Sequence, residues 1–191
     1  KAQLMSQRFQ QFIAQVETAL AQTDNEPALL AEVESAMRTL VAVDDWLPAD
    51  CAQPHPTYYQ QYLLHCDAQA RFSVVSFVWG PGQFTPIHDH LAWGVVGVLR
   101  GRELAQGFKL TASGIEADGP LVSLPAGAVA AVSPRIGDIH RVSNALSDQV
   151  SISIHIYGTD IGRQRRHVFD PATGAAKEFI SGYANANKDT P

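Results

Sequence analysis

The hydrophobic residues in the first third of the chain recur at the spacing of amphipathic helices. Apolar residues three or four positions apart lie on one face of an α-helix. Two such stripes occur, and the second follows Asn25 and Pro27, a polar residue and a proline that are typical of a helix start. The first stripe consists of Phe9, Phe12, Val16 and Leu20, and the second of Leu30, Val33, Met37, Leu40 and Val41. We therefore expect two helices, with Leu47 and Pro48 ending the second pattern.

From Arg71 onward the apolar residues form short runs that are rich in β-branched and aromatic side chains. Glycine, proline, asparagine or aspartate separates most of these runs. They span residues 72–79, 93–99, 103–110, 121–124, 128–132 and 150–157. Many short strands with turn signals between them are typical of a sandwich or a small barrel. We predict a single, mainly β domain over residues 1–191, with a mainly helical part over 1–64 and a β-barrel over 71–183.

The composition limits the classes of partner. The 191 residues carry a formal net charge of −5, which gives no basic surface for nucleic acid. No apolar run approaches the roughly 20 residues of a membrane span, and no apolar signal region follows Lys1. Cys51 and Cys66 are too few for a disulfide framework. We expect a cytoplasmic protein, a monomer or weak homo-oligomer with small-molecule partners, and a Cys51–Cys66 bridge is the minor alternative.

Three histidines are the strongest candidates for a metal site. His88 and His90 stand in H-x-H spacing within a β-type run, so both rings project to one side of the chain. His140 follows in a distant segment and could complete a face of three nitrogens. Such a face leaves coordination positions open, which is typical of catalytic metal sites. A single histidine is more often structural, but the paired spacing favours a metal ligand here.

The glycines and prolines around these histidines resemble the two motifs of the cupin superfamily. Gly82 stands six residues before His88, and Gly101 closes the strand that follows the H-x-H. Residues 125–127 and 134–144 supply the second motif. The resemblance implies a small β-barrel that holds a metal ion at its mouth.

One departure from the common cupin pattern concerns the ligands. The usual first motif places a glutamate shortly after the H-x-H, whereas this chain has Trp93, Gly94 and Val95 there, and its next acid is Glu103. The site therefore offers three neutral imidazoles and no carboxylate. An Fe(II) ion on neutral ligands keeps its full charge, which favours an anionic ligand such as a thiolate.

Three segments together resemble the cysteine dioxygenase family. They are residues 88–90, 137–144 and 151–158, and the resemblance covers most of the chain after about Tyr58. It implies a cofactor, Fe(II), bound by three histidines, with a small thiol and O2 as substrates. In that family both oxygen atoms are added to the sulfur, and the product is a sulfinic acid.

The third of these segments has an alternating pattern of its own. Ser153, His155 and Tyr157 are two residues apart and face the same way on a strand, while isoleucines occupy the opposite face. The resemblance implies a relay of hydroxyl, imidazole and phenol that hydrogen-bonds toward the oxygen reactant. The alternative for Tyr157 is an ordinary residue at the edge of the core. A buried polar row needs hydrogen-bond partners, which favours the functional interpretation.

Two differences within that family indicate the substrate. The animal-type enzymes carry a cysteine near the position of Gly94, cross-linked to the tyrosine that matches Tyr157, and an arginine where this chain has Gln61. Both differences resemble the bacterial branch that includes 3-mercaptopropionate dioxygenases. In that branch a late arginine binds the substrate carboxylate, and Arg166 matches it. A planar guanidinium suits a carboxylate because it donates two parallel hydrogen bonds.

We predict an Fe(II)-dependent thiol dioxygenase that acts on 3-mercaptopropionate, L-cysteine or both. Arg166 and Gln61 would hold the carboxylate, and Tyr157, His155 and Ser153 would orient oxygen. The alternatives are another metal-dependent cupin enzyme and a non-catalytic small-molecule-binding cupin. Five further basic residues are expected to be structural or exposed: His55, His65, His167, Arg163 and Arg165.

Overall fold

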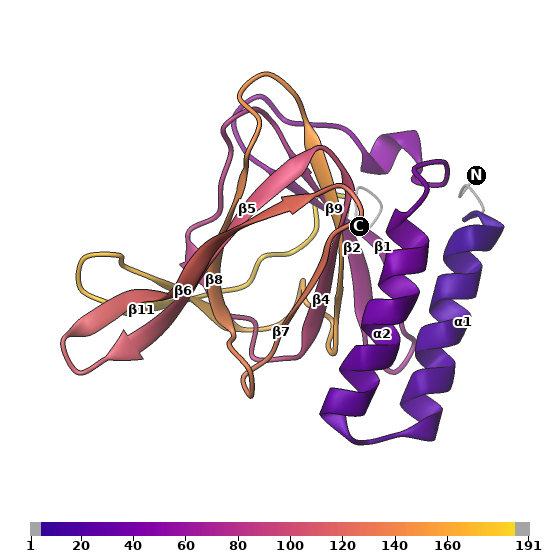
Figure 1. The fold of residues 1–191 in the computed structure, drawn as a ribbon, viewed down its shortest axis with the longest axis horizontal. Coiled ribbons are helices and arrows are strands. Elements are labelled where there is room, and N and C mark those ends of the chain that lie inside the picture. Colours follow the sequence, from indigo (N-terminus) through magenta and orange to yellow (C-terminus); the bar gives the residue numbers. More distant parts are fainter. Residues whose placement is uncertain (1–4, 186–191) are drawn as a thin grey trace, which may run out of the picture.

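The computed structural model describes residues 5–185, and it contains the two predicted helices (Figure 1). Helices α1 (Gln7–Gln22) and α2 (Glu26–Val41) lie side by side against the outer face of one β-sheet. Ser6 and Asn25 begin them, because each side chain accepts a backbone N–H of the first turn. The apolar stripes face the sheet. Neither helix has the length and apolar character needed to cross a membrane.

Within residues 5–185, the strands form two antiparallel sheets. Sheet A has the order β1-β2-β9-β4-β7, and sheet B has the order β11-β10-β3-β8-β5-β6. A short 3-10 helix, η1 (Ala49–Cys51), precedes the first strand. The strands are β1 (Gln60–Cys66), β2 (Ser73–Trp79), β3 (Ile87–His88), β4 (Gly94–Arg100), β5 (Arg102–Thr111), β6 (Gly114–Pro125), β7 (Val129–Val132), β8 (Ile139–Asn144), β9 (Ser151–Tyr157), β10 (Arg166–Phe169) and β11 (Ala176–Phe179).

The chain passes repeatedly from one sheet to the other. Strands β2, β4, β7 and β9 belong to sheet A, and strands β3, β5, β6, β8 and β10 between and after them belong to sheet B. A chain that winds through two facing sheets in this way forms a double-stranded β-helix, the jelly-roll architecture. The predicted fold class is confirmed: a mainly β barrel of the double-stranded β-helix type, preceded by α-helices.

The predicted limits of the helical part and of the strands need two corrections. Strand β1 starts at Gln60, inside the stretch 1–64 that was expected to be mainly helical. Its residues pair with β2 from Gln60 opposite Val78 to Cys66 opposite Ser73, and such long-range pairing leaves little trace in local periodicity. The short strands β10 and β11 were not predicted, because four residues carry too little pattern to identify a strand.

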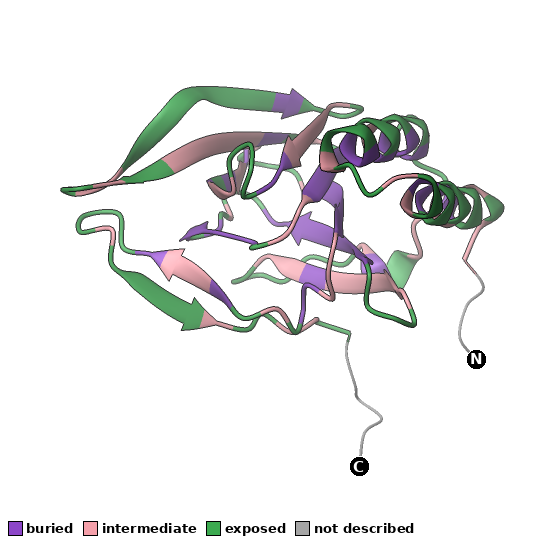
Figure 2. Ribbon diagram, turned by 90° about the horizontal axis from the view of Figure 1, so that it is seen from below, coloured by how far each residue is buried: buried purple, intermediate pink, exposed green. Residues whose placement is uncertain are grey.

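Strand β9 separates two hydrophobic cores. Ile152, Ile154 and Ile156 point outward from sheet A and are fully buried beneath the helices. The buried part of the ribbon lies between the sheets and under the helices (Figure 2). Gly97 on β4 permits the close approach of α2, because a Cβ atom there would lie 2.6 Å from Cγ of Met37. The inner faces of the two sheets enclose the second core.

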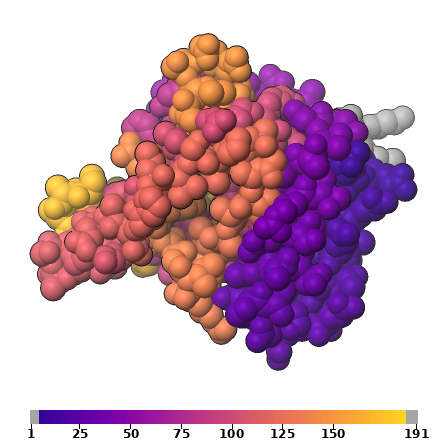
Figure 3. All heavy atoms as spheres, in the orientation of Figure 1, coloured from indigo at the N-terminus to yellow at the C-terminus, as the bar shows by residue number. Residues whose placement is uncertain are grey.

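The last described residues, 181–185, run beside β1. Ala184 N donates to Gln61 O at 2.7 Å, and the Asn185 side chain exchanges two hydrogen bonds with the backbone of Leu63. The segment thus lies along the free edge of sheet A. The space-filling view shows the helices along one side of the molecule and the β5–β6 hairpin projecting at the opposite end (Figure 3).

Candidate metal centre

The fold brings the three predicted metal ligands together inside the barrel. His88 on β3 pairs directly with His140 on β8, and His90 follows two residues after His88. The three rings are steeply inclined to one another, at interplanar angles of 67–80°, with centroids 4.7–4.8 Å apart. One candidate ligand atom from each residue lies within 4.8 Å of the other two, and all three side chains are buried. Residues 5–185 contain no other such group of histidine, cysteine or acidic side chains.

The outer nitrogens of two of these rings are held by the protein. His88 Nδ1 lies 2.9 Å from Pro86 O, and His90 Nδ1 lies 3.0 Å from Asp138 O and 3.1 Å from its Oδ1. Each acceptor favours a hydrogen on Nδ1, which leaves the Nε2 lone pair for a metal. His90 Nε2 is buried and has no hydrogen-bond partner among the described residues. A metal ion would supply that missing partner, so the donor set fits one.

Burial keeps these imidazoles neutral. It is the main cause that lowers the pKa of His88, His90 and His140, and for His88 and His140 the pKa falls well below its ordinary value. The positive charge of Arg166 lowers them further. A metal binds the neutral ring through its lone pair, so the lowered pKa values keep the three rings in the form that could bind an ion.

Two aspartates fix the segment that carries His90, and neither was given a role when the site was predicted from the sequence. Asp138 Oδ2 accepts hydrogen bonds from His90 N at 3.1 Å and Leu91 N at 2.9 Å. Asp89 Oδ1 accepts from His167 N at 2.7 Å, and its Oδ2 lies 2.9 Å from His167 Nδ1. In the sequence, only their positions next to candidate ligands could have pointed to these roles. The groups that the two aspartates bond lie in distant segments of the chain.

The predicted polar row is present on the inner face of β9. Ser153 Oγ lies 2.8 Å from His155 Nε2, and His155 Nδ1 lies 2.8 Å from Tyr157 Oη. The row ends at the metal centre, because the Tyr157 ring stacks on His90 with centroids 5.2 Å apart. Burial raises the pKa of Tyr157 and lowers that of His155 well below its ordinary value. Both side chains are therefore neutral hydrogen-bonding groups at neutral pH.

Gly94 leaves the space that the Tyr157 ring occupies. The two residues pair directly across β4 and β9. A Cβ atom on Gly94 would lie 2.6 Å from Cδ1 and 2.8 Å from Cε1 of Tyr157. Any side chain at this position would overlap the Tyr157 ring. The ring can lie where it does because residue 94 is a glycine.

Arg166 lies on the inner face of β10. It stands two residues before Val168, which pairs with His88, so the two side chains share one face. The arginine is 4% exposed. Its Nη1 donates to Asp89 O at 3.1 Å, its guanidinium lies over the Phe179 ring, and its Nε has no partner among the described residues. The predicted carboxylate-binding residue is therefore a buried cation near the metal centre.

A cavity of about 510 Å³ opens beside Arg166, between the free edges of the two sheets. Gln61 lies in its wall, as does Tyr59, which the sequence interpretation missed. The Tyr59 ring stacks on Trp79 with centroids 5.0 Å apart. Both hydrogens of the Gln61 amide are engaged, because Nε2 donates to Gly182 O at 2.9 Å and to Ser181 Oγ at 3.2 Å. Arg166 and Gln61 thus share one cavity, but only the arginine has a donor without a partner.

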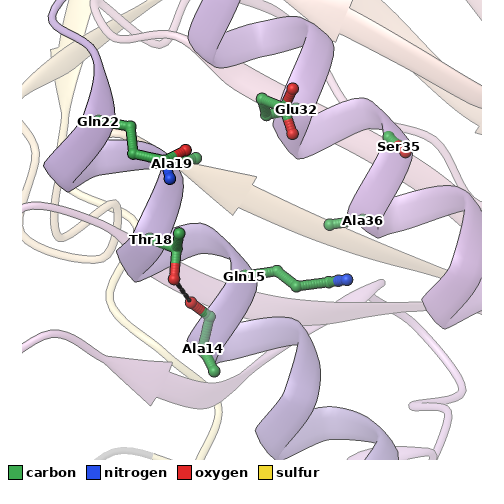
Figure 4. A pocket seen from close by; sticks show the side chains of 8 residues that line it. All are labelled: Ala14, Gln15, Thr18, Ala19, Gln22, Glu32, Ser35 and Ala36. Carbon is green, nitrogen blue, oxygen red and sulfur yellow. Dashed lines mark hydrogen bonds between the residues drawn. The ribbon is translucent and has the colours of Figure 1, made fainter.

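Two other hollows lie elsewhere. A mainly apolar cavity of about 280 Å³ lies on the other open side of the barrel, between β7 and the β5–β6 hairpin, and His140 forms part of its wall. A groove of about 260 Å³ lies between the helices and is lined by small and polar side chains such as Thr18 and Ser35 (Figure 4). The helix groove contains no histidine or cysteine, so the chemistry-bearing side chains gather inside the barrel.

The five basic residues that were predicted to be structural or exposed are not part of the three-histidine group. His55 Nδ1 accepts hydrogen bonds from two backbone N–H groups of its own loop. His65 stacks on Phe72, and Arg163 and Arg165 are exposed residues in ion pairs. His167 has a role that was not foreseen, since it holds Asp89. The two cysteines are free.

Comparisons with known proteins found structures of low sequence identity. No family model matches the sequence. An uncharacterized conserved protein with a double-stranded beta-helix domain from Klebsiella pneumoniae is 20% identical, with a TM-score of 0.46 over 58% of this chain and 84% of that chain. A cupin superfamily protein from Desulfitobacterium hafniense is 13% identical, with a TM-score of 0.46 over 62% and 94%. A structure of oxalate oxidase is 17% identical, with a TM-score of 0.45 over 56% and 55%.

Proposed function

We propose that the protein is an Fe(II)-dependent thiol dioxygenase for a small thiol carboxylate. The observation that carries this proposal is the neutral three-histidine centre on which the Ser153–His155–Tyr157 row ends. A metal that lacks a carboxylate ligand retains more positive charge and favours an anionic thiolate. Iron(II) would supply adjacent positions for the thiolate and O2, and a path for electron density between them. One thiol and one O2 would give one sulfinic acid.

Arg166 supports the carboxylate part of the substrate. Within residues 5–185, no acidic side chain forms a salt bridge with it, although it is almost completely buried. A buried cation is costly unless an anion or hydrogen bonds compensate for it. Its unpaired Nε and the adjacent cavity leave room for a carboxylate that accepts two parallel hydrogen bonds. We therefore assign the substrate carboxylate to Arg166.

Gln61 is a weaker candidate for the same role. Its two N–H bonds go to Ser181 and Gly182, and the amide oxygen that remains would repel a carboxylate. Binding a carboxylate through Gln61 would require those two bonds to break. In the arrangement described here, Gln61 holds segment 181–185 in the cavity wall. Its oxygen could accept a hydrogen bond from an ammonium group, the feature that distinguishes cysteine from 3-mercaptopropionate.

Tyr157 is the group that would orient the oxygen reactant. Its hydroxyl is held by His155, and its ring is held between His90 and the backbone at Gly94. No cysteine lies opposite the ring to form a cross-link, so the phenol stays free to donate or accept a hydrogen bond. We propose 3-mercaptopropionate as the preferred substrate, with some turnover of L-cysteine.

Oxygen uptake by the iron-loaded protein tests the proposal. The full chain is loaded with Fe(II) without air and given 3-mercaptopropionate, L-cysteine or buffer, and sulfinate is measured alongside O2. We expect one O2 consumed for each sulfinate formed, and none with zinc-loaded protein. Absence of uptake with both thiols, from protein shown to hold stoichiometric iron, would sink the proposal. Thiol binding without uptake would instead favour a non-catalytic binding protein, and turnover of a substrate without sulfur another metal-dependent enzyme.

A further inference from the structure

A carboxyl group is buried in the barrel wall without a hydrogen-bond partner. Glu103 on β5 is fully buried, and neither of its carboxyl oxygens has a partner among the described residues. Buried polar groups nearly always have partners, and an ionised carboxylate in such a place is costly. This residue is also the first acid after the H-x-H, yet it lies too far along the chain to serve as the usual cupin ligand. Its position needs another explanation.

The surroundings of Glu103 offer one group that could hydrogen-bond to it. Its neighbours across β8 and β6 are Asn144 and Leu124. The Asn144 amide is already bonded to backbone carbonyls and to Ser151. The Ser153 hydroxyl is the hydrogen-bonding group that lowers the pKa of Glu103, although no hydrogen bond within 3.5 Å joins the two side chains. Ser153 is therefore the member of the polar row to which the Glu103 carboxyl could hydrogen-bond.

Few other titratable groups face this carboxyl. On β4 the residue paired with Ser153 is Val98, and the residues paired with Glu103 on β6 and β8, Leu124 and Asn144, do not titrate. Arg102 bonds Ser123 on the exposed side. The titratable or charged side chains inside the barrel are His155 and Tyr157 of β9 and, beyond them around the three-histidine group, His88, His90, His140 and Arg166. Burial dominates, and it raises the pKa of Glu103 to about 8. At neutral pH the carboxyl therefore keeps its hydrogen and can donate it.

The protonated carboxyl determines the direction of every bond in the row. Ser153 Oγ has two lone pairs and one hydrogen, and the Trp79 indole N–H already donates to it at 3.3 Å. If Glu103 donates to the second lone pair, the serine hydrogen must go to His155 Nε2. His155 then carries its hydrogen on Nδ1 and donates it to Tyr157 Oη. The phenol hydrogen is left to point at the metal centre.

Ionisation of Glu103 reverses this order. The serine hydrogen turns to the carboxylate, so His155 must donate from Nε2 to Ser153. Its Nδ1 then accepts the hydrogen of Tyr157, and the phenol presents lone pairs to the metal centre. The row can thus exist in two forms that differ in the nitrogen of His155 that carries the hydrogen.

We propose that Glu103 is a positioning residue that sets the direction of the Ser153–His155–Tyr157 hydrogen bonds and keeps the Tyr157 hydroxyl as a donor toward the metal centre. The direction of the bonds does not depend on which reaction the centre performs. The consequence for turnover rests on the proposed dioxygenase function, because only there does the donor meet an oxygen reactant.

Nitrogen NMR of the full chain with labelled histidine tests the direction without any need for turnover. The His155 signals, assigned with His155→Gln, report which ring nitrogen carries the hydrogen. In the wild type we expect the hydrogen on Nδ1 at pH values below the pKa of Glu103, and on Nε2 at pH values above it. Glu103→Gln has an N–H donor at every pH and should keep the Nδ1 form throughout. Ser153→Ala breaks the connection, and its His155 signals should not respond to that titration.

The outcomes separate the two proposals. A wild-type His155 that keeps one tautomer across roughly two pH units on either side of the Glu103 value overturns the positioning role, and this holds even if Glu103→Gln fails to fold. If the tautomer switches as expected, the alkaline limb of kcat in iron-loaded protein should move to higher pH in Glu103→Gln, with KM unchanged. A switching tautomer in a protein that oxidises no thiol would leave the positioning role intact and refute only the dioxygenase function.

Discussion

The two faces of strand β9 are buried to the same degree but held in different ways. On the outer face Ile152, Ile154 and Ile156 pack against the helices, and each is fully shielded from water. On the inner face Ser153 and its polar neighbours are shielded as well, but by hydrogen bonds along one row. Apolar contacts are additive and tolerant of small shifts, whereas a hydrogen-bonded row depends on each member. One strand therefore separates folding stability from chemistry by its alternation.

The largest effect is expected on the inner face, where the three histidines would bind the metal. His140→Ala removes one of three ligands and should abolish stoichiometric iron binding, because two imidazoles cannot complete the face. Metal analysis after loading and desalting measures the iron content. His55→Ala, which changes an exposed loop histidine, is the matched control and should bind iron normally. Retention of one iron by His140→Ala would show that another residue is the third ligand.

Removal of one oxygen atom from the inner face should affect catalysis more than folding. Tyr157→Phe deletes the hydroxyl that His155 holds and should lower kcat by about 10²-fold or more, the range for a positioned proton-donating group. Iron content should stay at the wild-type level. Steady-state oxygen uptake gives kcat, and an unchanged kcat would exclude the phenol from the reaction.

The adjacent outer face should show the opposite behaviour. Ile154→Ala removes buried methylene groups beneath the helices and should lower the free energy of unfolding by about 2–5 kcal/mol. The remaining folded protein should bind iron and turn over substrate at close to the wild-type rate. Denaturant unfolding and oxygen uptake on the same preparation measure the two quantities. A large fall in kcat at full iron occupancy would mean that the two faces are coupled.

Substitution at the cavity should alter substrate binding selectively. Arg166→Ala should raise KM for 3-mercaptopropionate by roughly 10- to 100-fold, since a charge-assisted hydrogen bond contributes about 1.5–3 kcal/mol. A thiol of the same length without a carboxylate should show little change. Arg165→Ala, in the exposed neighbour, is the control. An equal KM for both thiols in Arg166→Ala would assign the carboxylate to a different group.

The smallest effect, when it is measured over a single pH unit, concerns the pH dependence of stability on the inner face. The pKa of Glu103 is raised to about 8 in the folded protein, so near neutral pH the folded chain holds a proton that the unfolded chain releases. The stabilisation is complete below the ordinary carboxyl pKa and is lost as the pH rises toward 8. Wild type should therefore lose up to about 1.4 kcal/mol per pH unit relative to Glu103→Gln. Parallel unfolding curves at every pH would contradict this.

Local pattern was sufficient to predict the features that depend on alternation along one strand. The H-x-H pair and the Ser153–His155–Tyr157 row were found because side chains two residues apart share a face. His140 was found through its motif. The density of short strands and turn residues indicated a sandwich or a small barrel, and the resemblance of the two histidine motifs to cupins indicated the barrel. These features need no knowledge of which strands pair.

The features that escaped prediction depend on pairing across the barrel. Asp138 contacts His90 only because β8 lies beside the H-x-H segment, and Glu103 on β5 lies near Ser153 on β9 only because the two sheets face each other. Strand β1 is a strand because it pairs with β2, and the two N–H donors of Gln61 are bonded to residues 120 and 121 positions away. No local periodicity reports such partners.

The contacts of residues 181–185 with β1 have a practical consequence for handling the protein. These residues form part of the wall of the cavity beside Arg166, yet they contribute no metal ligand. A protease that cuts after Ile180, which is itself exposed, would open the cavity and free the Gln61 amide. The nicked protein would still take up iron and pass any assay of metal content. Mass spectrometry of the intact chain is therefore the purity criterion that should accompany every measurement of KM.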